Sequence, residues 1–262
     1  MISGKRVIAA MLTALMAVTF TANTAVSVYA TGVTATENAQ TIDAQSTDAQ
    51  ALTPEEQKAQ ELQQVYDMPV ESNGYKDWPQ GPGTYGEAGI VMEVGTGTIL
   101  YAKNIDAHEY PASITKVLTA LVALENGQLT DNVTFSHDSV AFLQRGDSSV
   151  GLKEGNVITL DQAMHAMLLA SANEAAYAIG ESVGVNAGHD YNWFIEQMNS
   201  RCKELGGENS NFANTNGLHD PNHYTCARDM ALIGRELFKH PEFFQIVQTL
   251  NYTIPASETT EE

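Results

Sequence analysis

Tyr110-Pro-Ala-Ser-Ile-Thr-Lys-Val-Leu-Thr-Ala-Leu-Val-Ala-Leu-Glu-Asn-Gly127 joins a short polar start to a strongly apolar run. The apolar positions leave almost no polar face before Glu125 and Asn126, and Gly127 is a residue type that commonly ends a helix. A helix that is apolar on every side is buried inside its domain. The stretch therefore predicts a central, buried helix that begins at Ser113 and ends at Gly127.

Ser113 and Lys116 lie three residues apart, which places both side chains on one face of this helix. A serine hydroxyl is a poor nucleophile until a neighbouring base removes its proton. A lysine amine is such a base only when its pKa is lowered, and both burial and the positive end of a helix dipole act in that direction. The pair therefore predicts a serine nucleophile with a lysine base. Ser200 and Lys203 share the spacing, but they lie late in a polar helix predicted over 191–205, where we expect solvated surface.

The elements around the central helix predict a mixed domain. Residues 88–94 and 98–103 form a hairpin, with Gly95 and Gly97 suited to its tight turn. The other expected elements are a short strand at 133–135, a helix from a capping box at Thr159 and Gln162 to a break near Ser171, a helix over 174–184, a helix capped by Thr225, and a strand starting at 251–254. Helices placed between a hairpin and a late strand indicate an α+β domain.

Ser171-Ala-Asn173 lies at the expected junction of two helices, where side chains can point into a cleft. Together with Ser113-Ile-Thr-Lys116, it is similar to the first two of the three motifs of penicillin-recognising serine enzymes, Ser-x-x-Lys, Ser-x-Asn and Lys-Thr-Gly. Longer segments resemble the D-alanyl-D-alanine carboxypeptidases, a family of low-molecular-mass penicillin-binding proteins. These segments are the hairpin at 88–103, the nucleophile segment at 110–116, the second motif at 168–175 and the loop at 214–225.

The resemblance implies a β-lactamase/DD-peptidase-like fold, an antiparallel sheet flanked by helices. No Lys-Thr-Gly occurs in the 262 residues. In the family this motif lies roughly a hundred residues after the second one, so we expect it beyond Glu262 with the later strands and a final helix. Residues 86–262 are then the N-terminal part of the catalytic domain. The fold is expected to be incomplete in this chain, and the chain alone to be inactive and poorly stable.

The resemblance also implies a reaction, the removal of the terminal D-alanine from peptidoglycan stem peptides that end in D-Ala-D-Ala. Ser113 would attack the penultimate carbonyl, Lys116 would accept its proton, and Ser171 would relay a proton to the leaving D-alanine. Asn173 would hydrogen-bond the substrate amide and help to set Lys116, and the backbone N–H of Ser113 would donate to the oxyanion. β-Lactam antibiotics would act as inhibitors. The implied reaction needs no metal and no organic cofactor.

Other interpretations stay open at this level. Taken singly, Ser113 is equally well a helix cap and Lys116 a surface lysine. A class A β-lactamase needs a glutamate that activates the deacylating water; Glu208 is roughly the right distance downstream, but its surroundings lack the loop pattern of that enzyme. A non-catalytic cell-wall-binding protein or decoy remnant would keep a peptidoglycan-facing surface without turnover. Sequence beyond Glu262 that contains Lys-Thr-Gly would favour the carboxypeptidase.

Residues 1–30 are typical of a secretory signal peptide. Lys5 and Arg6 precede a mostly apolar run over 7–18, and Val28-Tyr29-Ala30 is suited to cleavage. The run is short for a membrane span, although an uncleaved anchor stays open. We therefore expect an exported protein at the cell wall or the outer face of the cytoplasmic membrane.

Residues 31–85 predict an acidic flexible spacer followed by a loop, with a short helix from Thr53 to Leu62. The formal net charge of −19 argues against a nucleic-acid partner and against charge-driven binding to anionic lipid. A membrane anchor beyond residue 262 stays open.

The chain holds two cysteines, Cys202 and Cys226. A disulfide is allowed in an exported protein, but two free buried thiols are the simpler expectation. His219 and His223 lie four residues apart in a loop rich in Gly, Pro and Asn, where stabilising the loop is a more common role than binding a metal. No Cys/His cluster has the spacing of metal ligands, so the sequence predicts no metal site.

Overall fold

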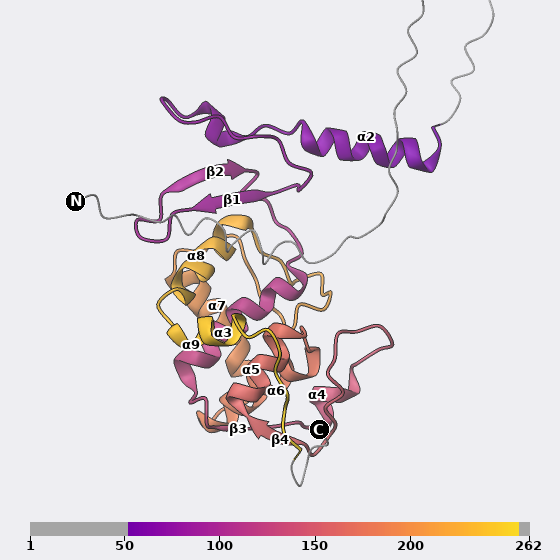
Figure 1. The fold of residues 1–262 in the computed structure, drawn as a ribbon, viewed down its shortest axis with the longest axis vertical. Helices are drawn as coiled ribbons and strands as arrows, with labels where there is room; N and C mark the ends of the chain where they lie inside the picture. The colour runs from indigo at the N-terminus through magenta and orange to yellow at the C-terminus, as the bar shows by residue number, and fades with distance from the viewer. Residues whose placement is uncertain (1–51, 257–262) are drawn as a thin grey trace, which may run out of the picture. The chain divides into compact units, whose positions relative to one another are not determined.

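The computed structural model describes residues 52–256 (Figure 1). The expected signal peptide and residues 31–51 of the expected spacer lie outside the described residues. In chain order the elements are α2 (Pro54–Tyr66), η1 (Glu71–Gly74), β1 (Gly89–Met92), β2 (Ile99–Lys103), η2 (Ala112–Ile114), α3 (Thr115–Asn126), β3 (Asn132–Thr134), α4 (His137–Ala141), β4 (Val157–Thr159), α5 (Leu160–Leu169), α6 (Asn173–Asn186), α7 (Tyr191–Glu204), α8 (Ala227–Leu237) and α9 (Pro241–Val247). This mixture of hairpins and helices confirms the predicted α+β class.

The described strands form two antiparallel two-stranded sheets, which lie at opposite ends of the helical body (Figure 1). β1 pairs with β2 in a register that sets Gly89 opposite Lys103, with an irregularity between Val91 and Met92. β3 pairs with β4, so that Val133 lies opposite Ile158. The hairpin at 88–103 and the short strand near 133 are thus confirmed.

α3 is the central helix of the described part, and the prediction that it is buried is confirmed. Eight of its twelve residues are buried, and α5, α6, α7 and α8 all pack against it. Its start differs from the expectation, because Ser113 lies in the 3-10 turn η2 and the regular helix begins at Thr115. Ala112, directly before Ser113, has a left-handed φ of 47°, so a right-handed helix cannot extend back through it.

The helices around the second motif follow the prediction closely. The capping box at the start of α5 is present, because Gln162 N–H donates to Thr159 Oγ1 over 3.2 Å and Thr159 N–H donates to Gln162 Oε1 over 2.8 Å. α5 ends two residues before Ser171, and α6 begins at Asn173, one residue earlier than expected. Both helix ends therefore bring Ser171 into a short connecting turn.

Two expectations for the C-terminal part were wrong. Cys226, and not Thr225, is the N-cap of α8, because its Sγ accepts a hydrogen bond from Asp229 N–H over 3.4 Å. Thr225 is instead held by Ser210, with 2.7 Å between the two hydroxyl oxygens. No strand forms at 251–254 within the described residues; there Tyr252 stacks on His165, with 3.7 Å between ring centroids.

The segment before the hairpin forms the helix α2, and two of its carbonyls, at Val65 and Thr84, are hydrogen-bonded to the end of β2. α2 begins with a capping box between Thr53 and Glu56 and extends to Tyr66, beyond the expected Leu62. Lys103 is fully buried at the end of β2, and its Nζ donates to the carbonyls of Val65 and Thr84 over 2.6 Å each. The end of the expected spacer therefore lies against the hairpin.

Cys202 and Cys226 are free and buried, as expected. Burial raises the pKa of each thiol to about 11, so both are protonated at neutral pH. Within residues 52–256, no helix is long and apolar enough to cross a membrane.

Candidate active site

Ser113 is exposed in the 3-10 turn η2, directly before the buried helix α3. It follows Ala112, which adopts a left-handed conformation that a residue with a Cβ takes at a cost of roughly 1–2 kcal/mol. Strain of this kind concentrates where a structure must hold a group in one orientation. The turn thus presents the Ser113 hydroxyl outward while α3 anchors the residues that follow.

Lys116 is only 3% exposed and lies in the first turn of α3. Its Nζ donates to Ser113 Oγ over 3.2 Å, to Asn173 Oδ1 over 2.8 Å and to the carbonyl of Asn216 over 2.7 Å. All three acceptors are uncharged. Burial lowers the pKa of Lys116 to about 8, an effect that the negative charge of Glu174 partly opposes.

Ser171 and Asn173 reach the same cluster from the junction of α5 and α6. Ser171 adopts a left-handed φ of 57°, and its Oγ donates to Ser113 Oγ over 2.9 Å. Asn173 is the first residue of α6, buried, and fixed through its side chain to Lys116. The structure therefore brings together all four residues that the sequence singled out.

Sequence reasoning missed the carbonyl of Asn216. Its oxygen lies closer to Lys116 Nζ than the other two acceptors do. This carbonyl reaches the cluster because Gly217 has a φ of 85° and packs against the backbone of Ala112. A Cβ on Gly217 would overlap the carbonyl oxygen of Ala112, so only glycine permits the approach. A backbone acceptor leaves no residue-type signature, and the resemblance of the loop at 214–225 was the only available signal.

His223 ties this loop to the start of α3. Its Nδ1 accepts a hydrogen bond from Ala213 N–H over 3.0 Å, which places the ring proton on Nε2. Nε2 therefore donates to Thr115 Oγ1, 2.7 Å away, on the residue directly before Lys116. Burial lowers the pKa of His223 to about 4, so the ring is neutral at pH 7. His223 has the loop-stabilising role expected from sequence; His219 instead packs edge-on against Tyr110.

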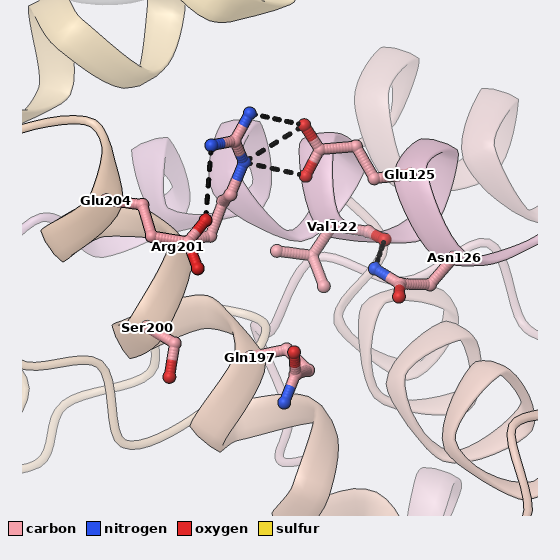
Figure 2. A pocket seen from close by; sticks show the side chains of 7 residues that line it. All are labelled: Val122, Glu125, Asn126, Gln197, Ser200, Arg201 and Glu204. Carbon is pink, nitrogen blue, oxygen red and sulfur yellow. Dashed lines mark hydrogen bonds and ion pairs between the residues drawn. The ribbon is translucent and has the colours of Figure 1, made fainter.

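Ser200 and Lys203 are exposed on α7 and lie apart from this cluster. Figure 2 shows Ser200 on the wall of a polar cleft between α3 and α7. The nearby cation in the cleft is Arg201, which is held by Glu125 over 2.8 Å and by Glu204 over 3.3 Å. The expected solvated surface at this pair is confirmed.

Glu208 is exposed in the turn after α7, and within residues 52–256 it is not among the hydrogen-bond partners of Ser113 or Lys116. The geometry therefore gives no support to Glu208 as the glutamate of a class A β-lactamase. Within residues 52–256, no group of His, Cys, Asp and Glu side chains is arranged to hold a metal ion.

Comparison with known proteins identifies the family. A family model described as D-alanyl-D-alanine carboxypeptidase, peptidase S11, matches residues 79–261. DacA of Haemophilus influenzae is 33% identical over 170 residues, which are 63% of this chain and 42% of that protein. DacF of Bacillus subtilis is 32% identical over 168 residues, which are 62% of this chain and 41% of that protein. The chain thus spans less than half the length of these two curated relatives.

Solved structures show the same fold. Penicillin-binding protein 5 from Haemophilus influenzae matches with a TM-score of 0.59 and 29% identity, over 67% of this chain and 52% of that one. A D-alanyl-D-alanine carboxypeptidase from Mycobacterium tuberculosis matches with a TM-score of 0.60 and 27% identity, over 73% of this chain and 69% of that one. The described α+β domain has the DD-peptidase fold, and the chain belongs to the peptidase S11 family of serine-type D-alanyl-D-alanine carboxypeptidases.

Proposed function

We propose that this protein removes the terminal D-alanine from peptidoglycan stem peptides ending in D-Ala-D-Ala, through an acyl-enzyme on Ser113. The observation that carries the proposal is the position of Lys116, a buried amine 3.2 Å from an exposed serine hydroxyl and otherwise surrounded by uncharged acceptors. Family membership supports the same reaction.

Lys116 is the base in this proposal. With a pKa of about 8, roughly a tenth of the molecules carry the neutral amine at pH 7. The neutral amine takes the proton of Ser113 as the serine oxygen bonds to the penultimate carbonyl carbon. Asn173 and the Asn216 carbonyl hold the amine beside Ser113, which keeps the lone pair within reach of the hydroxyl.

Ser171 and Asn173 have separate tasks. Ser171 is hydrogen-bonded to Ser113, so it is placed to pass a proton to the nitrogen of D-alanine as the peptide bond breaks. Asn173 uses its Oδ1 for Lys116, which leaves its amide N–H₂ to bind the substrate amide. The backbone N–H of Ser113 donates to the oxyanion, and water then releases the peptide from Ser113.

The proposed substrates and inhibitors follow from the same site. β-Lactams would acylate Ser113 because they mimic the D-Ala-D-Ala end of the peptide. The family consists of cell-wall enzymes that act outside the cytoplasm, and we place this protein there. Residues 1–30 are proposed as the export signal, residues 31–85 as the spacer and loop, and the residues from 86 onward as part of the catalytic domain.

Penicillin labelling tests the proposal. The protein is expressed from its complete reading frame and treated with benzylpenicillin, and intact mass and peptide mapping locate the adduct. We expect one adduct on Ser113, none in Ser113→Ala, and wild-type labelling in the control Ser200→Ala. Release of D-alanine from a D-Ala-D-Ala peptide then measures turnover. An adduct elsewhere, or no adduct on folded protein, would overturn the proposal. A penicillin adduct on Ser113 without release of D-alanine from the peptide would favour the non-catalytic alternative.

A further inference from the structure

Glu174 follows Asn173 directly in the chain and is fully buried in the first turn of α6. Its Oε1 accepts three hydrogen bonds, from Ser149 Oγ over 2.6 Å, from Val150 N–H over 2.8 Å and from Gly151 N–H over 3.2 Å. Three donors on one oxygen are the arrangement that an ionised carboxylate accepts. All three come from the loop between α4 and β4.

The same loop also contacts Asn173. The backbone N–H of Asn173 donates to the carbonyl of Ser148 over 2.9 Å. The N-cap of α6 is Ala172, whose methyl side chain cannot accept a hydrogen bond, and the Ser148 carbonyl instead accepts from the first N–H of the helix. The loop therefore both accepts from the start of α6 and donates to it. Asn173 is held through its own backbone N–H, which donates to Ser148, and through the next residue, Glu174, which accepts from the loop.

Glu174 also acts on Lys116 through its charge. The second carboxylate oxygen, Oε2, is buried and has no hydrogen-bond partner among the described residues, so its charge is poorly screened. The groups that touch Lys116 Nζ are Ser113, Asn173 and the Asn216 carbonyl, all uncharged. The carboxylate that acts on this amine is Glu174, which holds the pKa of Lys116 above the value that burial alone would set.

We propose that Glu174 is a positioning residue of this site: its carboxylate anchors loop 148–151, and this anchoring fixes Asn173, whose side chain holds Lys116 beside Ser113. The inference deepens the proposed function, because the role of Lys116 as base belongs to that proposal. The anchoring of the loop is independent of it.

Two substitutions separate the anchor from the charge. Glu174→Gln keeps an oxygen that can accept from the loop but removes the charge. We expect the midpoint of the pH profile for acylation by a fluorescent penicillin to move down by roughly one pH unit. Glu174→Asp keeps the charge but is one methylene shorter. We expect acylation to fall on the order of tenfold to a hundredfold across the profile, without a comparable shift of its midpoint.

Glu181→Gln is the matched control. Glu181 is also a glutamate of α6 with one buried, unpartnered oxygen, but it makes no contact with the loop or with Lys116 in the described part of the chain. Its pH profile should equal that of the wild type. A wild-type rate for Glu174→Asp would overturn the proposal. A wild-type pH profile for Glu174→Gln would show that the charge of Glu174 does not act on Lys116.

Two further readouts do not depend on acylation. Hydrogen exchange at the Val150 and Gly151 amides should accelerate in Glu174→Asp and stay slow in Glu174→Gln. An NMR titration of the Lys116 Cε signal should show a lower pKa in Glu174→Gln than in the wild type. If the wild type is not acylated but both results hold, the proposed function fails and the role of Glu174 stands. If acylation occurs but neither result holds, the role of Glu174 is refuted alone.

Discussion

His223 should make the stability of this protein fall between pH 7 and pH 5. In the folded chain its Nδ1 accepts from Ala213 N–H, so a second ring proton has no acceptor there and meets a donor. Burial lowers its pKa from 6.5 to about 4, with a partly opposing effect of Asp220. The unfolded chain therefore binds the proton at a higher pH than the folded one, and protons favour unfolding throughout this window.

The size of the effect follows from the two pKa values. A fall from 6.5 to about 4 corresponds to about 3 kcal/mol once pH is below both. At pH 5 the unfolded chain is almost fully protonated at His223 and the folded chain is mostly neutral, which gives a loss of about 2 kcal/mol relative to pH 7.5. The loss is complete only when the pH is well below 4, where other groups also titrate, so pH 5 is the better place to measure it.

The perturbation that isolates His223 is His223→Gln. A glutamine at this position can accept from Ala213 N–H and donate to Thr115 Oγ1 without titrating. Urea unfolding of both proteins at pH 7.5 and pH 5 gives four free energies. The wild type should lose about 2 kcal/mol more than the variant between the two pH values. His137→Gln, at an exposed site, is the matched control. Its loss of unfolding free energy between the two pH values should equal that of the wild type. Equal losses for wild type and His223→Gln would refute the reasoning.

Three further substitutions, with Lys203→Ala as a control, test the site and the elements that hold it. Lys116→Ala should abolish penicillin acylation while circular dichroism stays native, whereas Lys203→Ala should acylate at the wild-type rate; equal rates for both would exclude Lys116 as the base. Gly217→Ala forces a Cβ onto the carbonyl of Ala112, so acylation and melting temperature should both fall, and an unchanged melting temperature would contradict the close approach. Thr159→Ala removes the N-cap of α5 and should lower the unfolding free energy by about 1 kcal/mol with no effect on the pH profile of acylation, as measured by urea unfolding and penicillin labelling.

Local side-chain patterns predicted the features that depend on neighbouring residues. The capping box at Thr159, the apolar run of α3 and the spacing of Ser113 and Lys116 each involve residues a few positions apart, so the sequence displays them directly. The meeting of Ser171 with Ser113, 58 positions apart, was expected from motif resemblance and not from any local pattern.

Features that arise from tertiary contacts escaped prediction. Cys226 caps the N-terminus of α8, since the hydroxyl of Thr225 is bonded to Ser210, a partner that only the fold brings near. The Asn216 carbonyl is a backbone group and has no residue-type signal. Tyr252 stacks on His165 where a strand was expected, because in the described residues no neighbouring strand is there to pair with it.

The left-handed residues Ala112 and Ser171 bear on how this protein can change over evolution or in the laboratory. Each holds a hydroxyl of the cluster in place at the expense of backbone strain, and neither is glycine or asparagine, the residue types that adopt this conformation readily. Glycine at position 112 would relieve the strain and also loosen the turn that presents Ser113. At these two residues, a change that relieves the strain raises stability and loosens the site at the same time. A search for more heat-resistant variants would therefore select changes that also cost pre-organisation of the site.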